Sequence, residues 1–82
     1  MIWDLIWHHA AHWGLLNNLG PSAAARIDKA LMDFAAKGSG SIEQLDIDDP
    51  NRFRLRVEGA EARIFIDRRA RTILVTSIHR RR

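Results

Sequence analysis

Hydrophobic and polar residues alternate along the segment DPNRFRLRVEG, from Asp49 to Gly59. After a turn at Asp-Pro-Asn, arginines alternate with apolar side chains: Arg52, Phe53, Arg54, Leu55, Arg56 and Val57. A period of two in a run rich in strand-forming residues is typical of a half-buried β-strand. Residues 52–58 therefore predict a strand with three guanidinium groups on one face and apolar side chains on the other.

Two further strands are predicted after this one, over residues 62–67 and 72–79. Gly59-Ala60 and residues 68–71 supply the turns, so the three strands are expected to form a β-meander. Within the last strand, strict alternation places alternate side chains on opposite faces, with Ile73, Val75 and Ser77 against Leu74, Thr76 and Ile78.

The N-terminal half predicts one strand and two helices. Residues 2–8 are rich in β-branched and aromatic side chains, which favours a strand. Leucines recur at helical spacing over residues 10–19, where Gly14 weakens the helix and Gly20-Pro21 ends it. A second helix starts near Pro21-Ser22 and ends at Gly38, with one apolar stripe: Ala23, Ile27, Ala30, Leu31, Phe34 and Ala35.

The remaining segments complete the order of elements. Residues 38–41 (GSGS) form a flexible connector, and residues 42–47 (IEQLDI) a short irregular or extended piece. The resulting order, β-α-α-β-β-β, indicates an α+β domain with a helical hairpin packed on one face of a small antiparallel sheet. The other face is expected to be open and to carry the arginines. A chain of 82 residues is expected to form one domain, 1–82.

Charge is distributed unevenly along the chain. Residues 1–51 contain three Lys or Arg and seven Asp or Glu, whereas residues 52–82 contain ten and three. This polarity indicates a polyanionic partner for the C-terminal half, most often nucleic acid. The absence of cysteine excludes disulfides and thiolate metal sites. The lack of cysteine fits a reducing cytoplasm, and no apolar run is long enough for a membrane span, so a cytoplasmic protein without a membrane partner is expected.

Three histidines near the N-terminus have the spacing of metal ligands. His8, His9 and His12 form pairs three and four residues apart, which meet on one face of a helix. The segment lacks the glutamate of the H-E-x-x-H motif and spans a strand-to-helix junction. Polar residues at a surface turn are therefore favoured over a zinc site, and no metal or other cofactor is expected.

The three tryptophans allow two interpretations. Trp3 and Trp7 can stack on nucleic-acid bases, but large aromatic side chains are more often buried, so core packing is favoured. Trp13 lies off the leucine stripe and is expected to be exposed. An exposed tryptophan is most simply explained by a protein partner.

The arginines give the strongest functional signal. Arg52, Arg54 and Arg56 lie on one predicted strand, Arg63 lies on the neighbouring strand, and Arg81 lies near the end of the third. A row of charges is usually a solvated face, but this set is expected to converge on one sheet surface. Like charges across a sheet destabilise it, whereas guanidinium forks match phosphate oxygens. Phosphate recognition is therefore favoured.

The segments DPNRFRLRVEG and ARIFIDRRARTILVTSIHRR resemble the RelE/ParE superfamily of toxins from type II toxin–antitoxin systems. In members of this superfamily the C-terminal half of the sequence contains, in order, a strand of basic and aromatic residues, a G-D-Y-R hairpin, an I-D-D-E-A-R-T turn, a hydrophobic strand and a terminal G-H-R-R. The segment PSAAARIDKALMDFAAKGSGSIEQL is similar to the family's second helix and linker, so the likeness covers essentially the whole chain. The resemblance implies a RelE/ParE-like fold and a cognate antitoxin as partner.

In RelE-like members the toxin enters the ribosomal A site and cuts mRNA without a metal, using the RNA 2′-hydroxyl as nucleophile. The resemblance therefore implies an endoribonuclease that inhibits translation, with the ribosome and mRNA as partners. It implies phosphate and transition-state contacts at Arg54, Arg56 and Arg81, and further RNA contacts at Arg52 and Arg80. Two alternatives remain: a ParE-like inhibitor of DNA gyrase, and an inactive toxin that only binds its antitoxin.

Glu61 stands where the hairpin arginine of the family is usual. Arg63, two residues on, can project from the same face and substitute for it. Arginine is a poor general base, so His79 is the nearby side chain suited to proton transfer. The candidate catalytic residues are Arg54, Arg56, Arg63, His79 and Arg81. Glu61 is expected to pair with Arg63 or Arg81 and to repel the RNA backbone.

Overall fold

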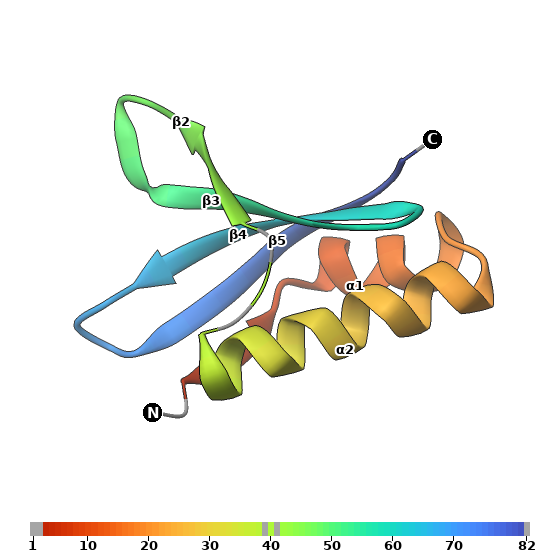
Figure 1. Cartoon of the computed structure of the whole chain (residues 1–82), viewed down its shortest axis with the longest axis horizontal. Coiled ribbons are helices and arrows are strands. Elements are labelled where there is room, and N and C mark those ends of the chain that lie inside the picture. Colours follow the sequence, from red (N-terminus) through yellow and green to blue (C-terminus); the bar gives the residue numbers. More distant parts are fainter. Residues whose placement is uncertain (1–2, 39, 41, 82) are drawn as a thin grey trace.

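A computed structural model describes residues 3–38, 40 and 42–81. Two helices lie against one face of a five-stranded sheet, and the opposite face is open (Figure 1). The elements follow in the order β1 (Asp4–Trp7), α1 (His9–Asn17), α2 (Pro21–Lys37), β2 (Ile42–Asp46), β3 (Asp49–Val57), β4 (Ala60–Asp67) and β5 (Thr72–Arg80). The predicted α+β class, with a helical hairpin packed on a sheet, is confirmed.

The sheet differs from the expectation in two respects. Its strand order is β1-β5-β4-β3-β2, and β1 runs parallel to β5 whereas the other pairs are antiparallel, so the sheet is mixed. Parallel neighbours need a long connection between them, and the helices and the other strands supply it. The piece expected to be irregular or extended is an edge strand, β2, in which Ile42 lies opposite Leu55.

The ends of α2 follow the sequence signals, whereas α1 ends at Asn17, two residues before the predicted end. α2 begins after Gly20 with Pro21 in its first turn, and it ends at Gly38, whose φ of 71° is left-handed. α1 begins one residue earlier than predicted, because Nδ1 of His8 accepts a hydrogen bond of 3.1 Å from the backbone N–H of Ala10. Within the part of the chain that the structure describes, neither helix is long and apolar enough to cross a lipid bilayer.

Gly14 weakens α1 as a helix but allows it to approach β5. A Cβ atom at this position would lie 3.0 Å from the carbonyl oxygen of Ile78 and 3.3 Å from its Cβ. These distances are shorter than ordinary van der Waals contacts, so a side chain at position 14 would require the helix or the strand to shift by a few tenths of an ångström. The glycine therefore allows α1 to pack closely on β5.

The core lies between the helices and the sheet. Its largest fully buried side chains come from α2 and from the three central strands: Ile27, Leu31, Leu55, Ile64, Ile73 and Val75. Half-buried aromatic and aliphatic side chains surround them at both ends of the layer. The apolar stripe predicted for the second helix therefore faces the sheet, as its spacing indicated.

A β-bulge in β5 changes the alternation predicted for the last strand. Ile78 was expected on the face opposite Val75, but it is only 2% exposed and belongs to the core. The register shifts after Arg63, which lies opposite Ser77, and leaves Thr76 as the extra residue. Ser77 and His79 therefore project from the open face of the sheet.

Candidate nucleic-acid interface

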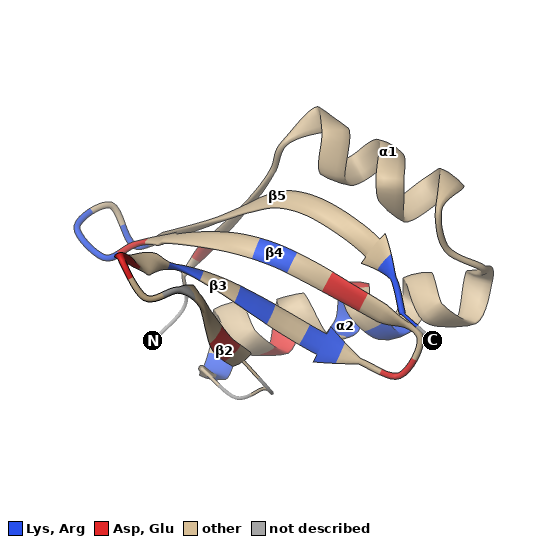
Figure 2. Cartoon of the chain, turned by 90° about the horizontal axis from the view of Figure 1, so that it is seen from above, with Lys and Arg blue, Asp and Glu red and all other residues tan. Residues whose placement is uncertain are grey.

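The open face of the sheet carries three rows of side chains that run across the strands. Residues directly opposite each other in paired strands project from the same face. The rows are Glu43, Arg54, Arg63 and Ser77; Arg56, Glu61 and His79; and Arg52, Phe65 and Leu74. In Figure 2 the basic bands of β3 and β4 lie side by side, next to an acidic band on β4. The predicted convergence of arginines from neighbouring strands is therefore present.

Glu61 lies at the centre of the arginines. Although it is a charged residue, it is only 8% exposed. Its Oε1 lies 3.4 Å from Nε of Arg56 and 4.0 Å from Nη1 of Arg54, and its Oε2 lies 3.6 Å from Nε of Arg63. The expected pairing with Arg63 is present, and Arg54 and Arg56, rather than Arg81, are the other partners. One carboxylate thus holds three guanidinium groups around a single point.

Glu43 of β2 is a second acidic partner, which the sequence did not predict. Its Oε1 lies 2.8 Å from Nη1 of Arg56, and its Oε2 lies 3.3 Å from Nη2 of Arg54. Residues 42–47 show no clean alternation, so their pairing with β3 was not expected. The available signal was electrostatic, because a row of arginines on one strand needs opposite charges on the strands beside it.

The three clustered arginines, Arg54, Arg56 and Arg63, outnumber the two carboxylates, so the cluster keeps one net positive charge. Their side chains are partly exposed, which leaves them accessible to a ligand. Nε of Arg54 is buried and has no hydrogen-bond partner among the described residues. Buried donors are nearly always paired in folded proteins, so this group is an exception within the cluster.

His79 lies beside the arginine cluster. It is opposite Glu61 in the sheet, and its Nε2 is 2.9 Å from Oγ of Ser77. The Ser77 contact fixes the orientation of the ring, which is otherwise exposed. An imidazole, a side chain that can serve as a proton donor or acceptor, thus lies in the same row as the central carboxylate.

The other predicted site residues make contacts outside the arginine cluster. Arg52 is on the same face, where its Nε makes a 2.9 Å salt bridge to Asp49 at the start of the same strand. Arg80 is turned toward the helices, since its Nε donates to the carbonyl oxygen of Asn18 at 3.2 Å. Arg81 follows β5, and its backbone N–H donates to the carbonyl oxygen of Gly59 at 3.1 Å. The structure therefore brings together Arg54, Arg56, Arg63 and His79.

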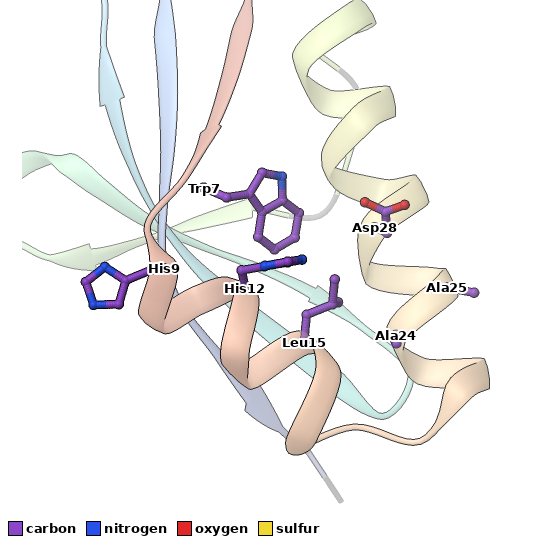
Figure 3. Close-up of a pocket in the computed structure, with 7 residues that line it drawn as sticks. All are labelled: Trp7, His9, His12, Leu15, Ala24, Ala25 and Asp28. Carbon is purple, nitrogen blue, oxygen red and sulfur yellow. The ribbon is translucent and has the colours of Figure 1, made fainter.

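The histidines of the N-terminal segment have separate structural positions. The ring of His8, which caps α1, stacks on His9 with 4.3 Å between the ring centroids. His12 lies edge-on to Trp7 at 6.5 Å. Figure 3 shows Trp7 and His12 at the space between α1 and α2, where a cavity of about 660 Å³ opens. Of the residues described, no three histidine or acidic side chains come together in a way that could hold a metal ion.

The tryptophans lie where the sequence placed them. Trp3 and Trp7 are half-buried and pack against the core. Trp13 is 61% exposed, and Leu16 on the same helix is 67% exposed. Together with His12 they line a second, shallow cavity on the outside of α1. Adjacent exposed apolar side chains of this kind are typical of a protein-binding surface.

No protein-family model and no curated protein sequence matches the chain. Its structure is similar to the RelBE2 toxin–antitoxin complex of Mycobacterium tuberculosis, with a TM-score of 0.81 and 17% identity over 99% of this chain and 94% of that chain. The isolated RelE toxin of E. coli is similar with a TM-score of 0.72 and 12% identity, over 98% of this chain and 85% of that chain. A double arginine-to-alanine mutant of that toxin is similar with a TM-score of 0.72 and 15% identity, over 96% of this chain and 83% of that chain. The chain therefore has the fold of RelE toxins, in agreement with the resemblance of its motifs.

Proposed function

We propose that this chain is the toxin of a type II toxin–antitoxin module and acts as a RelE-like, ribosome-dependent mRNA endoribonuclease that inhibits translation. The observation that carries the proposal is the convergence of Arg54, Arg56 and Arg63 around one point on the open face of a RelE-type fold. Guanidinium forks bind phosphate oxygens through two atoms, and donors aimed at developing charge stabilise a transition state. The residue type and the convergence of the cluster thus support cleavage of an RNA backbone as the proposed activity.

In the proposed reaction the ribose 2′-oxygen attacks the adjacent phosphorus, and the 5′-oxygen of the next nucleotide leaves. The products are a 2′,3′-cyclic phosphate and a free 5′-hydroxyl. The arginines stabilise the negative charge on the non-bridging oxygens. One proton leaves the 2′-hydroxyl and one reaches the 5′-oxygen, and His79, oriented by Ser77, is the residue suited to exchange them.

Primer extension on cellular mRNA after a short induction tests this proposal. Cuts within translated reading frames are expected for the parent protein. The double variant Arg54→Ala/Arg56→Ala should give none at equal protein level, whereas Arg68→Ala/Arg69→Ala, in the exposed turn before β5, should keep them. A DNA-damage response without mRNA cuts would contradict the proposal and would indicate gyrase as the target, as for ParE-like toxins.

An inactive toxin that only binds its antitoxin is the second candidate, and the position of Glu61 favours it. The carboxylate lies within 4.0 Å of the donors that a phosphate needs. At an effective dielectric constant near 20, a unit charge about 5 Å from a phosphate costs on the order of 3 kcal/mol before screening, or about a hundredfold in rate. Absence of cuts for both the parent and Glu61→Gln, with antitoxin binding retained, would select this candidate.

A cognate antitoxin is the proposed partner in both cases. One structural neighbour is a toxin–antitoxin complex, and Trp13 and Leu16 offer exposed apolar surface on α1. An acidic segment of the partner would complement the arginine cluster. Co-expression with the small open reading frame beside the gene, followed by pull-down, should recover a complex that Trp13→Ala weakens. A monodisperse toxin that retains nothing at moderate salt would contradict this partnership.

A further inference from the structure

A cavity of about 300 Å³ lies on the open face, beside the arginine cluster. Ligand pockets range from about 300 to 1,000 Å³, so this one has room for a single small group. Apolar, basic and hydroxyl side chains line it, among them Leu45, Arg52, Arg63, Phe65, Leu74 and Ser77. Phe65 lies at its centre in the sheet, with Leu74 opposite on β5 and Arg52 opposite on β3.

The apolar side chains of this cavity need an explanation, because the open face of an antiparallel sheet ordinarily carries polar residues. Phe65 does not belong to the core face, since it alternates with the buried residues Ile64 and Ile66. An aromatic ring flanked by arginines is the usual composition of a site for unpaired nucleotides, in which the ring stacks on a base and the cations bind the backbone. The basic lining and the volume of the cavity both fit that ligand.

Arg63 connects this cavity to the arginine cluster. Its Nε lies 3.6 Å from Oε2 of Glu61, and its side chain also lines the cavity. Arg63 and Phe65 are two residues apart on β4, so their side chains leave the same face about 7 Å apart. A phosphate bound by Arg63 therefore places the attached nucleoside over the ring of Phe65.

We propose that the cavity binds one unpaired RNA nucleobase, stacked on the ring of Phe65, while Arg63 holds its phosphate. The inference rests on the proposed function, because it takes the bound polyanion to be RNA. Every base has a π-face, so the stack accepts all four bases, and the hydroxyl of Ser77 offers a hydrogen bond to the base edge or the ribose. A base within a duplex is not accessible to the ring, so the site selects single-stranded RNA.

Fluorescence anisotropy with short labelled RNA tests this inference on the full chain. The probes are a single strand of mixed sequence and a strand of equal length made of abasic residues. Phe65→Ala should weaken binding of the normal strand by about tenfold and leave the abasic strand unaffected, because only stacking is lost. Phe65→Trp should keep the affinity. The salt dependence should not change in either variant, since the phosphate contacts remain.

Control variants separate the possible outcomes. Met32→Ala truncates an exposed apolar side chain on α2 and should bind like the parent, and Phe65→Leu keeps the apolar volume in case alanine unfolds the chain. Equal affinity of the parent and Phe65→Leu would overturn the nucleobase site, as would an equal loss for normal and abasic strands. If either outcome is found but Arg54→Ala/Arg56→Ala still weakens binding of the normal RNA strand, the nucleobase site is rejected and the proposed RNA function stands. Equal affinity of all variants would reject both proposals.

Discussion

Replacing Glu61 by glutamine removes one charge and almost no volume at the centre of the arginine cluster. The carboxylate has three guanidinium partners, at 3.4, 3.6 and 4.0 Å. Ion pairs with partly exposed arginines contribute about 0.2–1 kcal/mol each, so their loss should lower the free energy of unfolding by about 1–3 kcal/mol. Each kcal/mol corresponds to roughly 4–8 °C in the melting temperature of a domain of this size. Glu61→Gln is therefore expected to melt at a clearly lower temperature.

The same substitution is expected to raise the affinity for RNA. The cluster would carry two net positive charges instead of one, and the donors now directed at Glu61 would be available to phosphate. The gain in affinity is at most about a hundredfold before screening. The slope of log affinity against log salt should become steeper by about one phosphate contact. Stability and RNA affinity should thus move in opposite directions.

Thermal melts followed by circular dichroism, together with RNA anisotropy, measure both effects at low, physiological and high salt. The stability difference should shrink as salt screens the repulsion between the arginines. Glu61→Arg, the residue that the family resemblance implies, adds a fourth guanidinium group and should be the least stable form. A Glu61→Gln protein that is as stable as the parent and binds RNA no more tightly would refute the reasoning, because the carboxylate would then neither hold the arginines nor compete with phosphate.

Three further predictions concern packing and phosphate contacts. Gly14→Ala should lower the free energy of unfolding, measured in urea, by about 1–3 kcal/mol despite the better helix propensity of alanine, because the new Cβ would lie 3.0 Å from the Ile78 carbonyl oxygen. A higher free energy of unfolding than that of the parent would contradict the close contact of α1 and β5. Leu31→Ala truncates a fully buried side chain and should cost about 2–5 kcal/mol in the same measurement, whereas a loss below 1 kcal/mol would speak against its place in the core. Arg54→Ala/Arg56→Ala should lower RNA affinity and reduce the salt slope by about two, and an unchanged slope would remove both residues from the phosphate site.

The sequence predicted those parts of the fold that depend on neighbours in the chain. Pro21 and Gly38 mark the ends of α2, and the alternation of arginine with apolar residues marks β3. Pairing between distant strands has no such local signal, so the parallel position of β1 was not expected. The bulge at Thr76 also depends on packing against β4 and α1, which is why Ile78 was predicted on the wrong face.

The candidate site was predictable as a set of cations but not as a balanced cluster. Arg54 and Arg63 follow from the alternation of their strands. The contacts of Glu43 depend on the pairing of β2 with β3, and a weakly patterned segment does not reveal that pairing. Arg80 was predicted with the RNA contacts, but the bulge in β5 turns it toward the helices. Burial and strand register, rather than residue type, decide these positions.

The position of β5 has a consequence for the synthesis of this protein. β5 lies between β1 and β4, although it follows all the other described elements in the chain. Asp4 pairs with Thr72, and contacts this distant in sequence slow the formation of a fold. A nascent chain that ends before residue 72 leaves β1 without a strand partner and lacks His79 altogether. The complete open face, with the arginine cluster and His79 in one surface, therefore exists only after β5 has been synthesised.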